Sequence, residues 1–246
     1  MNQSRLTSLL FSASLVFFFS SCRGGGDEKT ASKDAVTADT AAMKPVAPVS
    51  TIVTTAEHLL VITQKVKDYG KWKIVYDAHD SVRLGAGVHN YVIGRSLHDS
   101  MIVLVALKVD DTAKAKAFAK DPGLKKVMIK GGVVGDPIIN FITEAWQDTA
   151  TIDSRIRSRT MLTVKDWDIW LKAFEGGKQE RLDNGITDRT ISHDLNDNKK
   201  VFVVTAITDS AKAYAYFKSD ALKKRRAESG VIGEPVRFLF RIVARY

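Results

Sequence analysis

The chain has 246 residues, of which 45% are hydrophobic and 26% are charged. This composition supplies enough apolar side chains for one large or two small domains, and it excludes a collagen-like, a disordered or a polytopic membrane protein. Lys and Arg number 37 against 28 Asp and Glu, so the chain is basic. The single cysteine excludes an intrachain disulfide and a cysteine-based zinc cluster.

The first 22 residues have the organisation of an export signal. A short start with one basic residue is followed by a mostly apolar stretch at 6–19, two serines and Cys22. The apolar stretch is shorter than the roughly 20 residues that span a bilayer. The cysteine after small residues resembles the lipobox of bacterial lipoproteins, which implies a signal peptide over 1–21 and an acyl anchor on Cys22 in the lipid bilayer. The alternative is an ordinary secretory signal in which Cys22 has no role.

Residues 22–55 are rich in Ala, Thr, Ser, Lys and Asp and carry no helical or strand period, which predicts a flexible tether. The position after Cys22 holds no Asp, which resembles the sorting pattern of outer-membrane lipoproteins. Asp27 and Glu28, after a glycine run, resemble a surface-export tag. These resemblances imply a lipoprotein of the cell envelope, in the outer membrane and exposed at the surface.

An internal repeat organises the rest of the chain. Shifting the sequence by about 98 residues aligns 66–142 with 164–240 without a gap, and roughly a third of the aligned positions are identical. The clearest matches are Trp72 with Trp170, Arg83 with Arg181, Gly87 with Gly185, and 132–137 with 230–235. We therefore expect two copies of one unit, the first over 56–147 and the second over 154–246.

Both copies carry the same signals in the same order. The first copy predicts a strand at 59–66, a helix capped by Asp68 and ending before Gly87, strands at 88–97 and 101–109, helices from 112, and a last strand at 138–146. The second copy predicts strands at 160–164, 186–195, 201–208 and 236–243, with a first helix after Asp166 and further helices from 210. The order β-α-β-β-α-β is that of the ferredoxin-like unit, so the fold class is α+β.

The apolar run at 101–107 lacks clean alternation, which predicts a strand buried on both faces. Helices cover one face of a ferredoxin-like sheet, and we expect the second copy to cover the other. The series of a strand, Asp-aromatic-x-x-Trp, Arg, Gly, a hairpin and Gly-Val-x-Gly-x-Pro resembles the dimeric α/β-barrel superfamily, which includes proteins similar to antibiotic-biosynthesis monooxygenases and small cyclases. The resemblance covers 57 to the C-terminus and implies two ferredoxin-like repeats packed sheet to sheet as an intrachain barrel.

The predicted first helices carry aromatic and arginine side chains. Trp72, Tyr76 and Trp170 either form an aromatic wall for a ligand or pack the helix onto the sheet. Arg181 offers a guanidinium for a carboxylate or an enolate. It lacks the ion-pair partner that Asp80 offers Arg83, because Lys178 stands at the equivalent position. The three aromatic residues and Arg181 are the candidate ligand-binding residues.

His79 and Arg83 are the candidate catalytic residues, because a histidine near Tyr76 and Arg83 on one helical side could act as a base. His79 aligns with Gly177, so such a site would exist in one copy only. The alternative is that His79 lies at the surface, where the residue type has changed between the copies without a functional role.

The sequence contains no His, Cys or carboxylate spacing typical of a metal site, and we expect neither a metal nor a cofactor. An exported lipoprotein is also not expected to bind nucleic acid, despite its basic balance. Three functions remain open: binding of a small apolar or aromatic molecule, a cofactor-independent monooxygenase-like or isomerase-like enzyme, and a purely structural envelope protein. We favour the binding protein over the enzyme.

Overall fold

The computed structural model describes residues 50–246. The predicted signal peptide, Cys22 and most of the predicted tether lie outside the described residues. In the part that is described, no helix is long and apolar enough to cross a membrane.

The first ferredoxin-like repeat follows a short strand, β1 (Ile52–Val53). Its elements are β2 (Glu57–Val66), α1 (Tyr69–Ala78), α2 (Asp80–Gly85), β3 (Val88–Ser96), β4 (Ile102–Val109), α3 (Thr112–Ala119), α4 (Pro122–Lys130) and β5 (Val133–Asp148). Asp68 caps α1 as predicted, because its carboxylate accepts a hydrogen bond from the Lys71 backbone N–H at 2.8 Å. The predicted first helix is interrupted at His79, where the backbone (φ −95°, ψ 11°) leaves the helical region.

The second repeat has the same order. Its elements are β6 (Ile156–Val164), α5 (Trp167–Gly176), α6 (Lys178–Asp183), β7 (Ile186–Asp194), β8 (Lys200–Ile207), α7 (Ser210–Phe217), α8 (Asp220–Glu228) and β9 (Val231–Arg245). Asp166 caps α5, and the helix is interrupted at Gly177. Gly87 and Gly185, the equivalent residues that end these helices, both have φ of 67°, a backbone conformation that favours glycine.

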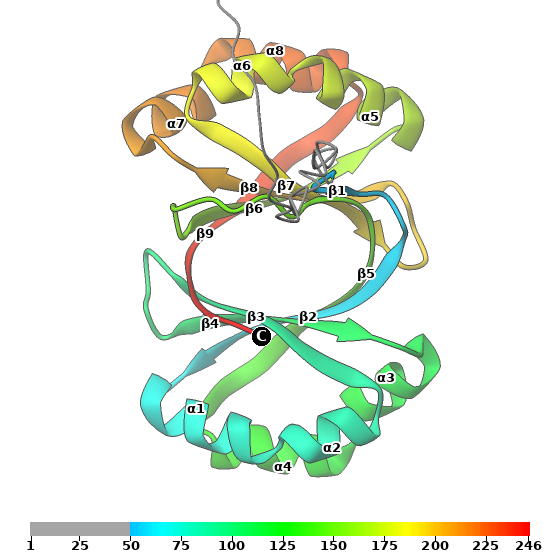
Figure 1. The fold of residues 1–246 in the computed structure, drawn as a ribbon, viewed down its shortest axis with the longest axis vertical. Coiled ribbons are helices and arrows are strands. Elements are labelled where there is room, and N and C mark those ends of the chain that lie inside the picture. The colour runs from blue at the N-terminus through cyan, green and yellow to red at the C-terminus, as the bar shows by residue number, and fades with distance from the viewer. Residues whose placement is uncertain (1–49) are drawn as a thin grey trace, which may run out of the picture. The chain divides into compact units, whose positions relative to one another are not determined.

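The strands close into a barrel. Neighbours in the sheet follow the order β1-β5-β2-β4-β3-β9-β6-β8-β7, and β5 also pairs with β7. The two repeats are thus joined at two seams, antiparallel β3–β9 and antiparallel β5–β7 (Figure 1). This arrangement confirms the predicted α+β fold of two ferredoxin-like repeats that form an intrachain barrel.

Helices cover the outside of the barrel on two opposite sides, α1 to α4 on one and α5 to α8 on the other (Figure 1). The outward side chains of each half-sheet pack against those helices, around Trp72 in the first repeat and Trp170 in the second. The inward side chains face the other repeat. β4 therefore has both faces covered, as predicted, with Val103 and Val105 toward the helices and Leu104 toward the barrel interior.

Two local features differ from the prediction. Ile52 and Val53, in the last part of the predicted tether, pair with Asp148 and Gln147 and extend the sheet as β1. The last strand of each repeat also begins earlier than the predicted starts at 138 and 236, so Pro137 lies inside β5. The register between β2 and β5 shifts there, and a proline is tolerated at such an irregularity because no ladder hydrogen bond from its nitrogen is needed.

Candidate functional site

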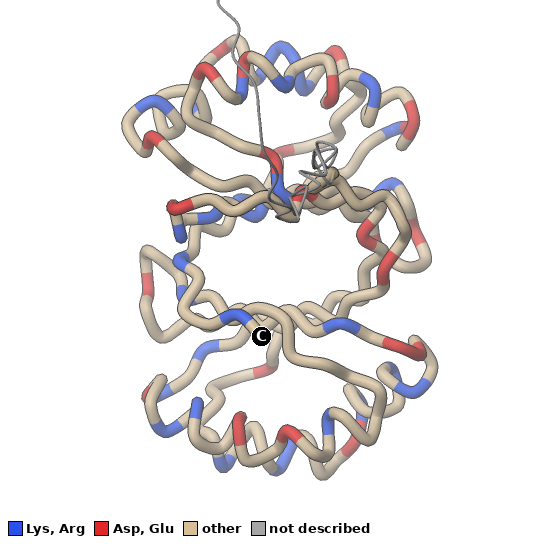
Figure 2. Tube along the Cα trace, viewed as in Figure 1, with Lys and Arg blue, Asp and Glu red and all other residues tan. Residues whose placement is uncertain are grey.

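A cavity of about 350 Å³ lies inside the barrel. One part of its wall is apolar and is formed by Leu59, Val61, Leu104, Ile142, Phe202 and Phe240. The other part is polar or charged and includes Tyr91, Lys108, Glu144, Gln147, Asp148, Arg157, Arg159, Arg189, Thr190, Ser192 and Arg245. Lys and Arg as well as Asp and Glu occur on the strands around the barrel interior and not only on the helices (Figure 2).

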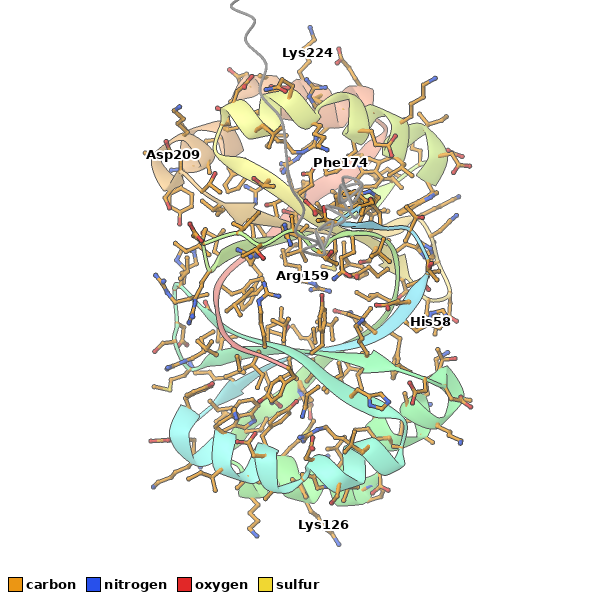
Figure 3. The ribbon with its side chains drawn as sticks, viewed as in Figure 1. His58, Lys126, Arg159, Phe174, Asp209 and Lys224 are labelled. Carbon is orange, nitrogen blue, oxygen red and sulfur yellow. The ribbon has the colours of Figure 1, made fainter. Side chains whose placement is uncertain are left out.

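Strand alternation decides which side chains reach this cavity. On β2, Leu59 and Val61 point inward, while Leu60 and Ile62 pack under the helices. The equivalent inward positions on β6 hold Arg157 and Arg159. Figure 3 shows Arg159 directed into the space between the two half-sheets. The two halves of the barrel therefore share a backbone plan and differ in chemistry at the same positions.

A bulge in each second strand adds one further side chain to the cavity. The register between β3 and β4 shifts between Asn90 and Val92, and that between β7 and β8 shifts between Asp188 and Thr190. The extra residues are Tyr91 and Arg189, which line the cavity and occupy equivalent positions in the repeat. Bulges commonly re-aim a side chain in this way.

The two arginines of β6, Arg157 and Arg159, have no carboxylate partner among residues 50–246. Arg157 is 3% exposed, and its Nη1 donates to the backbone oxygens of Ser154 and Ile156 at 2.7 and 2.9 Å. Arg159 donates to Asn140 Oδ1 at 3.2 Å and lies over the Phe202 ring. Burial lowers the pKa of both guanidinium groups to about 10, since desolvation disfavours the charged form.

Arg189 and Arg245 add positive charge beside Arg157. Desolvation is the main cause of the lowered pKa of Arg157, and repulsion from Arg245 and Arg189 adds to it. Arg189 donates to the Ala150 backbone oxygen at 2.7 Å, and its Nη1 lies 3.5 Å from Asp148. That buried Nη1 has no hydrogen-bond partner among the described residues.

Glu144 is the buried acid of the cavity. It is 5% exposed, and burial raises its pKa to about 7, with repulsion from Glu57 as the second cause. Thr190 and Lys108 act in the opposite direction. A carboxyl group that titrates near neutral pH can accept or donate a proton under ordinary conditions.

The predicted residues of the first repeat gather in a different place, between helices and sheet. Trp72 stacks on Tyr76, and the Arg83 guanidinium lies 3.8 Å from the centre of the Tyr76 ring. Arg83 also donates to the Tyr76 backbone oxygen at 2.7 Å and to Asp80 at 3.0 Å. With His79 these side chains line a space of only about 50 Å³.

The second repeat arranges its predicted residues in the same way. Trp170 stacks on Phe174, and Arg181 makes a buried two-fold contact with Asp188 at 2.8 and 2.7 Å. Arg181 also donates to the Phe174 backbone oxygen at 2.7 Å. Phe174 lies between helix and sheet in Figure 3, beside a space of about 80 Å³. Both spaces are well below the 300 Å³ or more typical of ligand pockets, so the geometry favours the barrel cavity as the site.

The sequence contained a signal for the barrel cavity that motif reasoning missed. Arg155, Arg157 and Arg159 occupy alternate positions at the start of the second copy, where the first copy has Glu57, Leu59 and Val61. Alternation places such residues on one face of a strand. In the described part of the chain, no group of three or more His, Cys, Asp or Glu side chains is arranged to hold a metal ion.

The fold and its internal cavity define a class: a single-chain α/β barrel built from two ferredoxin-like repeats. No protein-family model matches the sequence, and no curated protein matches it. The chain is similar to the solved structure of a candidate monooxygenase from Fusobacterium nucleatum subsp. nucleatum, with TM-score 0.51 and 12% identity over 78% of this chain and 94% of that chain. It is also similar to an anthrone oxidase-like protein, with TM-score 0.52 and 13% identity over 79% of this chain and 95% of that one. Similarity at this level of identity establishes the fold alone.

Proposed function

We propose that this protein binds a small molecule inside its barrel. The observation that carries the proposal is the 350 Å³ cavity, in which an apolar wall meets several buried polar side chains. Ligand sites generally combine these features at volumes of about 300 to 1,000 Å³. A purely structural barrel would instead fill its interior with large side chains. Here Trp72 and Trp170 pack under the helices and leave the interior open.

Native mass spectrometry of the full-length protein purified from its native host tests the proposal. We expect a bound small molecule that is released on denaturation. Ala106 lines the cavity, so Ala106→Trp should fill it and abolish this adduct. Ala215 is exposed on α7, and Ala215→Trp is the matched control that should keep the adduct.

Circular dichroism and thermal unfolding establish whether Ala106→Trp still folds, and Ala106→Met provides a milder filling of the cavity. Absence of any adduct on the wild-type protein would contradict the binding function. An adduct that persists in a folded Ala106→Trp variant would place the ligand elsewhere.

A monooxygenase-like enzyme is the second candidate, and Glu144 is the observation that favours it. Its carboxyl group lines the cavity and has a pKa of about 7, which suits a proton acceptor acting on a bound substrate. A binding protein returns its ligand unchanged. An enzyme of this kind would consume dioxygen when the released molecule is added back, and Glu144→Gln would slow that consumption.

We further propose that the protein is a lipoprotein of the cell envelope, anchored through acylated Cys22. The position of the only cysteine, directly after an apolar stretch and two serines, supports the proposal. Cys22→Ala should move the protein from the membrane fraction to the soluble fraction and abolish labelling by a radioactive fatty acid. Ser32→Ala is the control and should change neither result. Unchanged membrane association of Cys22→Ala would overturn the anchor.

A further inference from the structure

The charges on the cavity wall are unbalanced. Five cationic side chains line it, namely Lys108, Arg157, Arg159, Arg189 and Arg245, against the two carboxyl groups of Glu144 and Asp148. Lys108 pairs with Glu57 at 2.7 Å, and Arg189 lies 3.5 Å from Asp148. Arg157, Arg159 and Arg245 have no carboxylate within ion-pair distance among the described residues. Burying cations costs several kcal/mol each unless an opposite charge compensates.

The arginine cluster also has unused hydrogen-bonding capacity. Arg189 lines the cavity and is 9% exposed. Its buried Nη1 lies 3.5 Å from an Asp148 carboxylate oxygen and has no hydrogen-bond partner in the described chain. The Nη1 of Arg157 is bonded only to backbone oxygens, which leaves its charge unneutralised. A planar guanidinium group with free N–H donors suits the two oxygens of a carboxylate.

The cationic region extends to one end of the barrel. A second hollow, of about 420 Å³, is lined by residues 152–155 and 242–245 and shares Arg157, Ile242 and Arg245 with the barrel cavity. It adds Arg155, and its single acid is Asp153. An anion approaching this end meets three arginines before it reaches the interior.

The apolar part of the wall belongs mainly to the first repeat. Leu59, Val61 and Leu104 form one buried cluster there, to which the second repeat contributes Phe202. At the positions equivalent to Leu59 and Val61, the second repeat has Arg157 and Arg159. The cavity is therefore amphipathic, with a hydrophobic side and a cationic side.

We infer that the ligand of the barrel is an organic carboxylate with an apolar body. Its carboxylate lies among Arg157, Arg189 and Arg245, and its body lies against Leu59, Val61 and Phe202. This inference rests on the proposed binding function and specifies the chemical class of the ligand. It also explains why the two repeats keep the same fold while their inward residues differ.

Two matched pairs of probes test the inference on the full-length protein by isothermal titration calorimetry in about 150 mM salt, which screens surface charges. The pairs are naphthalene-2-carboxylate with naphthalene-2-carboxamide, and octanoate with octanamide. The two members of each pair have nearly the same shape, and only the carboxylate is charged. We expect at least one carboxylate to bind about tenfold or more tightly than its amide, since hydrogen bonds to charged groups are the stronger ones.

Arg189→Gln and Arg245→Gln should each weaken binding of the carboxylate by about tenfold and leave binding of the amide unchanged. Arg241→Gln is the matched control, because Arg241 is exposed on β9 and does not line the cavity. Arg245 is exposed at the rim, so its replacement leaves the buried core intact and separates binding from folding.

The outcomes distinguish the two proposals. If no probe binds, the proposed binding function fails together with the inference. If carboxylate and amide bind equally well, or if the variants change neither affinity, the cavity binds ligands but the anionic class is wrong. If Arg241→Gln reduces carboxylate binding as much as Arg245→Gln does, the preference is nonspecific attraction and the inference is overturned.

Discussion

Replacement of Glu144 by glutamine removes a carboxyl group whose ionisation destabilises the folded protein. The side chain is 5% exposed, and burial, followed by repulsion from Glu57, raises its pKa from 4.5 to about 7. Lys108 on β4 and Thr190 on β7 offset part of this effect, and Tyr91 lies close enough for its own pKa to be raised by Glu144. The raised pKa means that the folded state favours the protonated acid.

The magnitude follows from the difference between 4.5 and about 7, since each pKa unit corresponds to about 1.4 kcal/mol. Below about pH 4 the acid is protonated in both states, and the ionisation costs nothing. Between pH 4.5 and 7 the unfolded chain releases the proton while the folded protein retains it, so stability falls as the pH rises. Above pH 7 the cost is constant at about 3 kcal/mol.

Urea unfolding followed by tryptophan fluorescence at pH 4, 6 and 8.5 measures this cost as the difference between Glu144→Gln and wild type. The variant should match wild type at pH 4 and exceed it by about 3 kcal/mol at pH 8.5. Glu175→Gln is the control, because Glu175 is exposed on α5 and its replacement should give the same small difference at every pH. A difference for Glu144→Gln that does not change with pH would show that ionisation of Glu144 does not destabilise the folded protein.

Two further predictions concern packing and a buried ion pair. A Cβ atom at Gly94 would overlap the ring of Phe240 inside the barrel, so Gly94→Ala should lower the free energy of unfolding by about 1–3 kcal/mol. Asp188→Asn should cost about 3 kcal/mol, because it leaves Arg181 buried without its opposite charge. Both effects are measured by urea unfolding at pH 7.

Each of these variants has a matched control. A Cβ at Gly176 meets open space, so Gly176→Ala should change stability by less than about 1 kcal/mol. In the first repeat, Asp77 pairs with Lys73 at 2.6 Å and both side chains are partly exposed, so Asp77→Asn should cost at most about 1 kcal/mol. Equal losses in Asp77→Asn and Asp188→Asn would contradict the role of burial, and a stable Gly94→Ala would mean that Phe240 moves without cost.

The candidate site could be predicted from the sequence only in part. The sequence places His79, Tyr76 and Arg83 on one helical side, and in the structure Arg83 lies over the Tyr76 ring, which stacks on Trp72. These side chains contact one another and the sheet beneath the helix, and helical spacing alone does not predict those contacts. Arg157 and Arg189 come from a first strand and from a bulge, and no motif joins them in sequence.

The repeat, the order of its elements and the residues that begin and end them can be predicted from the amino-acid sequence. Those features depend on local physics: Asp68 and Asp166 cap helices through backbone groups three residues away, and Gly87 and Gly185 supply a positive φ. The pairing of β3 with β9 and of β5 with β7 is visible only in the folded chain. Those pairings join strands far apart in the chain, where loop closure and side-chain fit decide the outcome. Because closure turns the inward faces of two similar sheets toward each other, it also decided that arginines of one repeat and aliphatic side chains of the other enclose one cavity.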